Sequence, residues 1–223
     1  MSLKKDNYKS SDKKIMNFAI NLAENNKYIT GTNPSVGCVI VKNNKILSFA
    51  TTNYGGRPHA ESIALNKNRS NKGTSLYSTL EPCSHHGVTP PCTNAIIKNK
   101  VKRVFYSIKD KDLRTFNKTK KILKSKKIVA ISGLQKQKVK SLYNEYNYIR
   151  SKKAPYIIGK IASSSNLNIL KNNSPITNIH SRNVSHILRL QNHAILTSYK
   201  TINTDNPKPV SYTHLTLPTK RIV

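Results

Sequence analysis

The stretch that decides the fold is a His-Ala-Glu triplet followed by two cysteines in a proline-rich segment. It reads His59-Ala60-Glu61 and then Thr79-Leu80-Glu81-Pro82-Cys83-Ser84-His85-His86-Gly87-Val88-Thr89-Pro90-Pro91-Cys92. One imidazole and two thiolates supply three zinc ligands and leave the fourth tetrahedral position open for water, as in catalytic zinc sites. We therefore expect zinc to be bound by His59, Cys83 and Cys92. Glu61 is close enough to transfer protons beside that water without binding the metal, so it is the predicted catalytic residue.

The alternative interpretation of the cysteines is a closed structural zinc site, or buried thiols with no metal. A closed site requires a fourth Cys or His at short spacing from one of the others. The third cysteine, Cys38, lies in the apolar run Gly37–Val41, where a free thiol is expected to pack in the core. His85 and His86 lie in the loop between the other two cysteines and are the alternative fourth ligands.

These segments resemble the deaminase half of the bifunctional riboflavin-biosynthesis deaminase/reductase family. The stretch Asn33-Pro34-Ser35-Val36-Gly37 resembles the family's Asn-Pro-x-Val-Gly motif. Eight residues separate Cys83 from Cys92, whereas two separate the cysteines of the general zinc-deaminase pattern. The longer spacing makes this motif more specific than the general pattern. The similarity runs from about Asp12 to Pro209.

The resemblance implies both a fold and an activity. The fold is α/β, with a three-layer cytidine-deaminase-like domain followed by an incomplete dihydrofolate-reductase-like α/β domain. The implied reaction is zinc-dependent hydrolytic deamination of 2,5-diamino-6-ribosylamino-4(3H)-pyrimidinone 5′-phosphate, with Asn33 and His85 contacting the substrate. An NADPH-dependent reductase is expected only in a full-length protein, and Lys160 and Asp205 match positions of that half.

The chain departs from the family's pattern at several places. Thr52 stands where the family has a histidine, and Val88 replaces the basic residue before Thr-Pro-Pro-Cys. The family's Asp-Pro-Asn-Pro is Asp110-Lys111-Asp112-Leu113 here, and its Ser-Leu-Asp-Gly is Ser164-Ser165-Asn166-Leu167. These changes affect the recognition of the ribose phosphate. They leave open a zinc deaminase acting on another base, nucleoside or tRNA, and a non-catalytic copy that keeps zinc as a structural element.

Hydrophobic periodicity supports an α/β domain. The pattern predicts strands at 38–41, 46–49, 75–80, 104–108 and 128–131, and helices around 15–23, 59–65, 92–98, 115–123 and 135–148. Ser10 or Ser11 is the predicted cap of the first helix, and Asn43-Asn44 the turn between the first two strands. Cys92 would begin a helix, whose partial positive charge favours its thiolate.

The chain is predicted to hold a deaminase domain at 1–153 and the first part of a reductase domain at 154–209. The second part is expected to contain strands at 156–162 and 194–197 and a helix at 182–190. Residues 210–219 resemble one reading frame of a transposon-type sequencing adapter, with 220–223 as barcode. We therefore treat 210–223 as an artefact and expect the gene to be longer.

Composition limits the classes of partner. The formal net charge is +30, but 31 lysines stand against 8 arginines and are scattered along the chain, as AT-rich codon usage produces. The sequence contains no focused basic patch of the kind that would indicate a dedicated nucleic-acid partner. Three cysteines give no disulfide framework, and the N-terminus has no apolar run typical of a signal peptide. No segment approaches the roughly 20 apolar residues of a membrane span. We expect a cytoplasmic protein with a small phosphorylated substrate, and homo-oligomerisation is left open.

Overall fold

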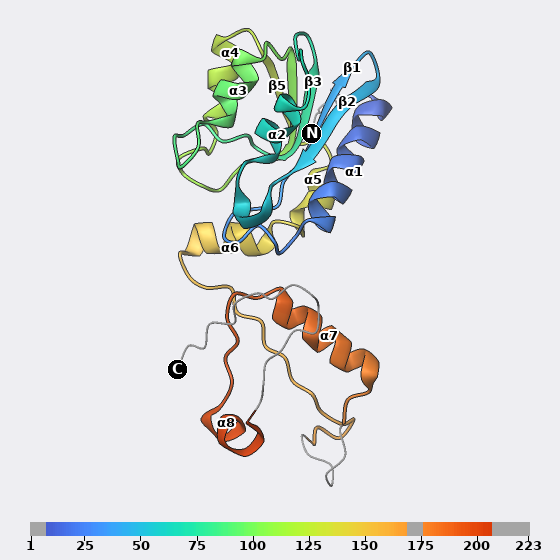
Figure 1. The fold of residues 1–223 in the computed structure, drawn as a ribbon, viewed down its shortest axis with the longest axis vertical. Helices are drawn as coiled ribbons and strands as arrows, with labels where there is room; N and C mark the ends of the chain where they lie inside the picture. Colours follow the sequence, from blue (N-terminus) through green and yellow to red (C-terminus); the bar gives the residue numbers. More distant parts are fainter. Residues whose placement is uncertain (1–7, 169–175, 207–223) are drawn as a thin grey trace, which may run out of the picture. The chain divides into compact units, whose positions relative to one another are not determined.

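A five-stranded mixed sheet organises the first part of the chain in the computed structural model (Figure 1), which describes residues 8–168 and 176–206. The strands are β1 (Gly37–Lys42), β2 (Lys45–Thr51), β3 (Ser75–Leu80), β4 (Arg103–Ile108) and β5 (Val129–Ser132), in the order β2-β1-β3-β4-β5. β1 pairs antiparallel with β2 and β3, whereas β3, β4 and β5 run parallel. The five predicted strands of this part are thus confirmed, each within two residues of its expected bounds.

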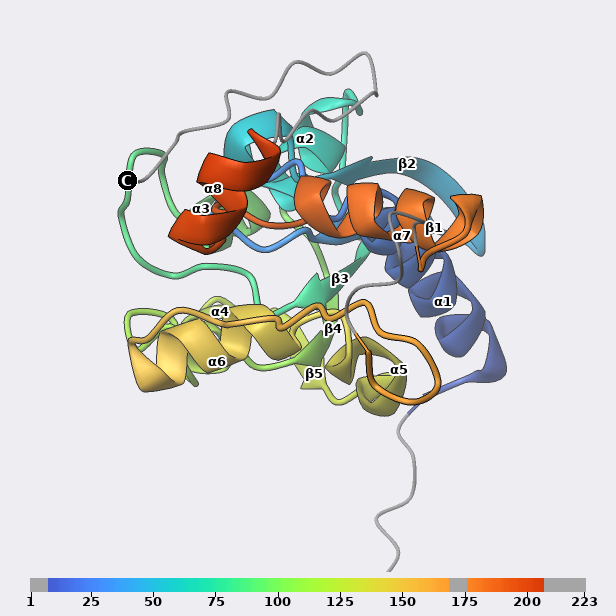
Figure 2. The same cartoon turned by 90° about the horizontal axis from the view of Figure 1, so that it is seen from below.

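Helices cover both faces of the sheet and give the expected three layers. The helices of this part are α1 (Ser10–Asn25), α2 (Ala60–Asn66), α3 (Cys92–Lys98), α4 (Thr119–Ser125), α5 (Lys136–Lys140) and α6 (Asn144–Lys152). α1 and α5 lie on one face, where Gln135 Nε2 donates to Asn17 Oδ1 at 2.9 Å, and α2, α3 and α4 line the other face (Figures 1 and 2).

The burial of the strands follows from this layering. Every residue of β3 is buried, and so are all residues of β1 except Lys42, because helices shield both faces of these central strands. β2 is one of the two edge strands, and burial alternates in its second half, with Phe49 half exposed and Ala50 buried. Cys38 is completely buried in the core, as predicted.

Two turns next to the sheet have the geometry that their sequences indicate. Asn43 and Asn44, between β1 and β2, have φ of 50° and 61°, which confirms the tight turn expected from this pair. Gly37, at the start of β1, has no room for a side chain, since a Cβ there would collide with the backbone carbonyl of Ala19 in α1. This glycine therefore allows α1 to pack closely on the strand that follows the Asn33-Pro34 turn.

Several helix boundaries differ from the prediction. The residue that caps α1 is Lys9, not Ser10 or Ser11, and its backbone N–H is bound by the carboxylate of Asp12 at 2.8 Å. α4 begins at Thr119, after Asn117 adopts a φ of 61° that interrupts helix formation. The single helix predicted over 135–148 is two helices, α5 and α6.

Tyr143 explains the break between α5 and α6. Its backbone leaves the helical region, and its side chain is almost fully buried. The hydroxyl donates to the carbonyl of Ser35 at 2.8 Å and shares a hydrogen bond of 2.6 Å with Thr79. The chain thus exchanges helical hydrogen bonds for a contact that ties α6 to the Asn33–Gly37 stretch.

The chain divides into two units between Tyr156 and Ile157, and the second is described by itself. It contains α7 (Ile179–Leu190), which confirms the predicted helix and begins earlier because the Asn178 side chain accepts a bond from Ser181 N, and α8 (Tyr199–Asp205). The predicted strands at 156–162 and 194–197 are wrong, since neither segment finds a hydrogen-bonded partner strand among the described residues. Apolar side chains of this unit, such as Leu196, remain exposed.

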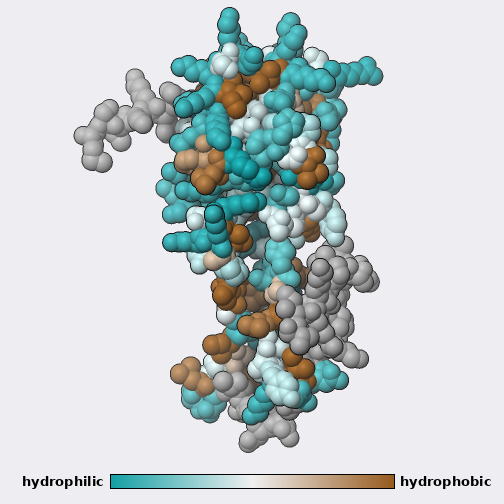
Figure 3. All heavy atoms as spheres, turned by 90° about the vertical axis from the view of Figure 1, so that its left-hand side faces the viewer, coloured by the Kyte–Doolittle hydropathy of each residue, from teal (hydrophilic) through white to brown (hydrophobic). Residues whose placement is uncertain are grey.

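Hydrophilic side chains cover most of the face of the first unit shown in Figure 3, consistent with lysines that are spread over the surface. Within the described ranges, 8–168 and 176–206, no helix is both long and apolar enough to cross a bilayer. The residues assigned to an adapter, 210–223, lie outside the described part.

Candidate metal centre

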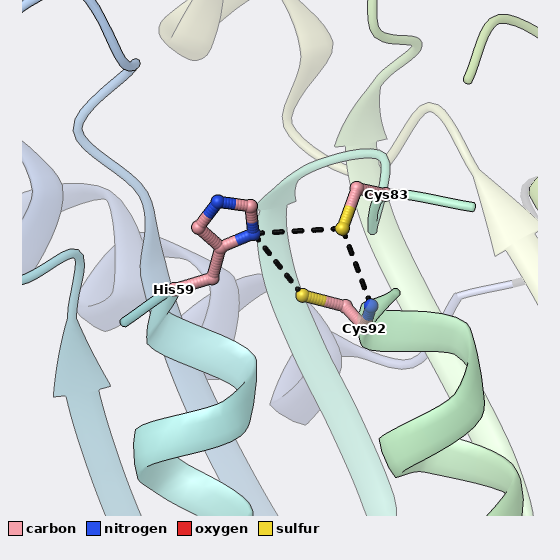
Figure 4. Close-up of side chains that lie close together, drawn as sticks. All are labelled: His59, Cys83 and Cys92. Carbon is pink, nitrogen blue, oxygen red and sulfur yellow. Dashed lines mark hydrogen bonds between the residues drawn. The ribbon is translucent and has the colours of Figure 1, made fainter. Parts of the chain in front are cut away.

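Three predicted ligands meet where two helices begin and a strand has ended. His59 is the residue immediately before α2, Cys92 is the first residue of α3, and Cys83 follows β3 by three residues. Their side chains point toward one another (Figure 4), and their ligand atoms lie within 4.8 Å. Two helix starts thus meet at the carboxyl end of a central strand, where α/β sheets commonly place their sites.

The geometry of this cluster fits a zinc ion. His59 Nδ1 lies 3.3 Å from Cys92 Sγ and 3.5 Å from Cys83 Sγ. Tetrahedral zinc with Zn–N near 2.1 Å and Zn–S near 2.3 Å separates nitrogen and sulfur by about 3.6 Å. Nδ1 is therefore the imidazole atom that faces the metal position, and two sulfurs and one nitrogen form a donor set that zinc prefers.

The pKa values of the two thiols are shifted in opposite directions, and the thiolate expected at Cys92 is favoured at Cys83 instead. Hydrogen bonds from the Cys92 thiol, His59 and the Cys92 backbone lower the pKa of Cys83 to about 4. The pKa of the Cys92 thiol is raised by the hydrogen bond with Cys83 and by burial. The start of α3 does favour a thiolate, but its Cys92 N–H points to Cys83 Sγ, at 3.2 Å, so the neighbour benefits.

Glu61 lies in the first turn of α2 and is almost completely buried. Burial raises the pKa of its carboxyl group, since a charge is poorly solvated there. Ser78 of β3 donates to Oε1 at 3.0 Å, and Oε2 lies 3.6 Å from Cys92 Sγ. One carboxylate oxygen thus faces the thiol of a predicted ligand and the other is held by Ser78, an arrangement that suits a proton carrier beside the metal.

Asn33 is held in a turn next to the centre. It lines the same pocket as His59 and Glu61. Thr30 Oγ1 donates to its carbonyl oxygen at 2.7 Å. Thr52, where the family has a histidine, stabilises this turn through two hydrogen bonds. Its hydroxyl donates to Pro34 O at 3.1 Å and accepts from Val36 N at 2.9 Å. A buried threonine therefore has a structural role here and presents no imidazole to the pocket.

The loop between the cysteines contributes His85 to the pocket. Its Nδ1 lies 3.0 Å from Thr115 Oγ1, which fixes the ring, whereas His86 is exposed and does not line the pocket. Glu81 is buried and its Oε2 accepts from Asp110 N at 3.2 Å, so it braces the loop after β4. Neither histidine belongs to the group of metal-ligating atoms found in the described residues.

The arginines that line the pocket were not predicted from the sequence. The pocket is also lined by Arg57, Arg114 and Arg150 and by Asp110 and Asp112. Arg114 binds the Asp112 carboxylate through two nitrogens, at 2.9 Å and 2.6 Å, and holds its pKa well below the usual range. A chain with 39 basic residues gives no sequence signal that singles out these three.

The two predicted residues of the reductase half lie in the second unit. Lys160 is exposed in a segment without regular structure, and Asp205 is the last residue of α8. The roles of both residues stay predictions.

Comparison with known proteins confirms the resemblance. Residues 9–108 match the cytidine and deoxycytidylate deaminase zinc-binding region. The chain is 37% identical over 200 residues to the riboflavin biosynthesis protein RibD of Aquifex aeolicus, covering 88% of this chain and 56% of that protein. Residues 9–108 are therefore similar to a cytidine-deaminase-type domain.

Solved structures agree. RibD of Acinetobacter baumannii matches with a TM-score of 0.83 and 33% identity, covering 88% of this chain and 56% of that one. A diaminohydroxyphosphoribosylaminopyrimidine deaminase/5-amino-6-(5-phosphoribosylamino)uracil reductase of Thermotoga maritima matches with a TM-score of 0.82 and 31% identity, covering 92% and 60%. The chain spans about half the length of the curated relatives it matches.

Proposed function

We propose that this chain, which is similar over most of its length to RibD proteins, is the deaminase of 2,5-diamino-6-ribosylamino-4(3H)-pyrimidinone 5′-phosphate. The observation that carries the proposal is the His59–Cys83–Cys92 cluster with the Glu61 carboxylate beside it, inside a domain of the zinc-binding deaminase type. The eight-residue spacing of the cysteines and the Asn33–Gly37 stretch favour this substrate over a free base or nucleoside.

His59 Nδ1 and the sulfurs of Cys83 and Cys92 would hold the zinc ion. Zinc at this position supplies a Lewis acid that lowers the pKa of water to about 7. Cys92 is buried, and His59 and Cys83 are partly buried.

Glu61 is the proposed proton carrier. It takes a proton from the attacking water as the new C–O bond forms at the amidine-like ring carbon, and delivers it to the ring nitrogen. Glu61 then transfers the proton of the new hydroxyl group to the exocyclic amine, so that the C–N bond breaks, the amine leaves as ammonia and the ring carbon becomes a carbonyl. Burial raises the pKa of this carboxyl group, which suits a group that must both accept and donate protons near neutrality.

Asn33 and His85 are proposed to position the pyrimidine. They line the pocket with Glu61, and each is held by one neighbour, Thr30 for Asn33 and Thr115 for His85. A side chain amide and an imidazole offer both donors and acceptors to the polar edge of the ring.

The wider assignments are proposals too. Residues 1–153 form the deaminase domain and 154–209 the first part of a reductase domain, which would use NADPH in a longer protein. Lys160 and Asp205 would belong to that site. A cytoplasmic location and the lack of a dedicated nucleic-acid partner stay predictions from the sequence.

The test is a substrate panel. The full chain, loaded with zinc, is assayed for ammonia release from the diaminopyrimidine ribosyl-phosphate, cytidine, guanine and a tRNA containing the target adenosine. We expect turnover of the first compound alone. Turnover of one of the others instead would assign a different zinc deaminase, and stoichiometric zinc without any turnover would support the non-catalytic alternative.

A further inference from the structure

The three arginines that line the pocket differ in how their charges are compensated. Arg114 forms a two-pronged ion pair with Asp112, and Arg150 lies 3.8 Å from the same carboxylate. Arg57 has no carboxylate oxygen within 4.0 Å among the described residues. It is therefore the pocket cation whose charge is free to attract an anion from solution.

Arg57 is nevertheless held in place. Its Nη1 donates to Thr89 Oγ1 at 2.7 Å, and a Cβ at Gly87 would lie 3.3 Å from its Nη2. The absence of a side chain at Gly87 leaves room for the guanidinium against the loop between the cysteines. A guanidinium fixed in this way loses little further freedom when it binds a ligand, so its remaining N–H donors are preorganised.

The contact between Arg57 and His59 points to a common acceptor. Arg57 Nη1 lies 3.4 Å from His59 Nε2, on the side of the ring opposite the nitrogen that faces the sulfurs. When Nδ1 binds a metal, Nε2 carries the hydrogen, so the ring and the guanidinium each have a donor nitrogen at this 3.4 Å contact. A ligating histidine ordinarily gives this N–H to a carboxylate, carbonyl or water. An anionic oxygen placed there would accept from both.

From this geometry we infer that Arg57 recognises the phosphate monoester of the substrate. The inference rests on the proposed function. Val88, which replaces the basic residue usual before Thr-Pro-Pro-Cys, is largely exposed and brings no charge to the loop. The Arg57 guanidinium reaches that same loop at the neighbouring Thr89, so the positive charge arrives from the segment before His59.

The test compares the phosphorylated substrate with its dephosphorylated ribosyl analogue. Arg57→Gln and Arg57→Lys are measured in the zinc-loaded full chain. Arg69→Gln, an exposed arginine outside the pocket, is the control with the same net charge as Arg57→Gln. Loss of charge-assisted hydrogen bonds should lower kcat/KM for the phosphorylated compound by roughly 10- to 100-fold and change that of the analogue by less than about 3-fold. The ratio of the two values does not depend on the fraction of folded protein.

Arg57→Lys should recover part of the ratio, since it keeps the charge and loses the fork. An equal loss with both compounds, or a ratio that Arg57→Gln leaves unchanged, would overturn the inference. A binding measurement separates it from the proposed function: calorimetry with the phosphorylated substrate on Glu61→Gln, with and without Arg57→Gln. Tight binding that needs Arg57, without turnover by the native chain, would refute the deaminase and leave the inference standing. Equal binding by both variants would refute the inference alone.

Discussion

Substitution of Gly56 should disturb the pocket through Asn33. Gly56 lies in the turn three residues before His59 and has a φ of 88°. A Cβ there would collide with the side chain of Asn33 and lie 2.7 Å from the carbonyl oxygen of Thr30. The adjacent Gly55 has a φ of 69°, but a Cβ there would meet nothing within 4 Å. Gly55→Ala is therefore a matched control that carries the backbone penalty without the collision.

The expected magnitudes follow from these two terms. A side chain in the left-handed region costs about 1–2 kcal/mol, which both variants lose. Overpacking adds about 1–3 kcal/mol for Gly56→Ala alone, so its free energy of unfolding should fall below that of Gly55→Ala by this amount. Since Asn33 is the proposed substrate contact, the Michaelis constant should also rise in Gly56→Ala.

Urea unfolding of the zinc-loaded chain gives the free energies, and ammonia release at varied substrate concentration gives the Michaelis constants. Equal unfolding free energies for the two variants would show that the turn moves away from Asn33 without cost. A lowered stability with an unchanged Michaelis constant would show that Asn33 does not position the substrate.

Three further outcomes are expected. In the zinc-free chain at pH 6, iodoacetamide should label Cys83 before Cys38 and Cys92. The reason is that the pKa of Cys83 is lowered to about 4, whereas the pKa values of the other two thiols are raised, so only Cys83 is largely ionised at this pH. Zinc should suppress the labelling, which is measured by peptide mass spectrometry. Cys92→Ser should weaken zinc binding by at least about 100-fold in a competition assay with a chelator, since loss of a second-shell partner alone costs 10- to 100-fold, whereas Cys38→Ala should bind zinc normally. Tyr143→Phe should lower the free energy of unfolding by about 1–3 kcal/mol, because it leaves the buried carbonyl of Ser35 without a donor.

Each of these outcomes can fail in an informative way. Labelling of Cys92 ahead of Cys83 would show that Cys92, at the helix start, is the thiolate and that its thiol has the lower pKa of the two. Normal zinc binding by Cys92→Ser would require another ligand, for which His85, in the same pocket, is a candidate. Unchanged stability of Tyr143→Phe would mean that water replaces the hydroxyl at Ser35.

The sequence predicted the metal centre because its signal is local. His59 and Cys92 stand where helices begin, Cys83 lies three residues after a strand, and the spacing of the motif already contains that arrangement. The central strand β1 was predictable for the same reason, since a strand covered on both faces forms a short, continuous apolar run such as Cys38–Val41.

Interactions between distant segments could not be predicted from the sequence. Tyr143 breaks a helical pattern to reach Ser35, 108 residues away, and nothing in the local sequence indicates this. The Cys92 amide stabilises the thiolate of Cys83 and not its own, which depends on how the loop folds back. The apolar runs at 156–162 and 194–197 have the composition of strands, but a strand needs a partner, and the described residues of that unit offer none.

The pocket arginines show the same limit. Arg57, Arg114 and Arg150 are three of 39 basic residues, and only the structure distinguishes them from the solvated majority. The difference between Arg57 and the other two depends on the position of Asp112, which is two residues from Arg114 in sequence but close to Arg150 only in space.

In the proposed function, the His59–Cys83–Cys92 cluster holds a catalytic zinc ion and Glu61 carries the protons. Glu61→Gln tests it most directly, because the amide keeps the acceptor for Ser78 and the shape of the side chain but cannot transfer protons in the same way. With one zinc per chain confirmed by elemental analysis, ammonia release from the diaminopyrimidine ribosyl-phosphate should fall by roughly 10²- to 10⁴-fold relative to the native chain. Turnover near the native rate at full zinc occupancy would show that Glu61 does not carry the protons.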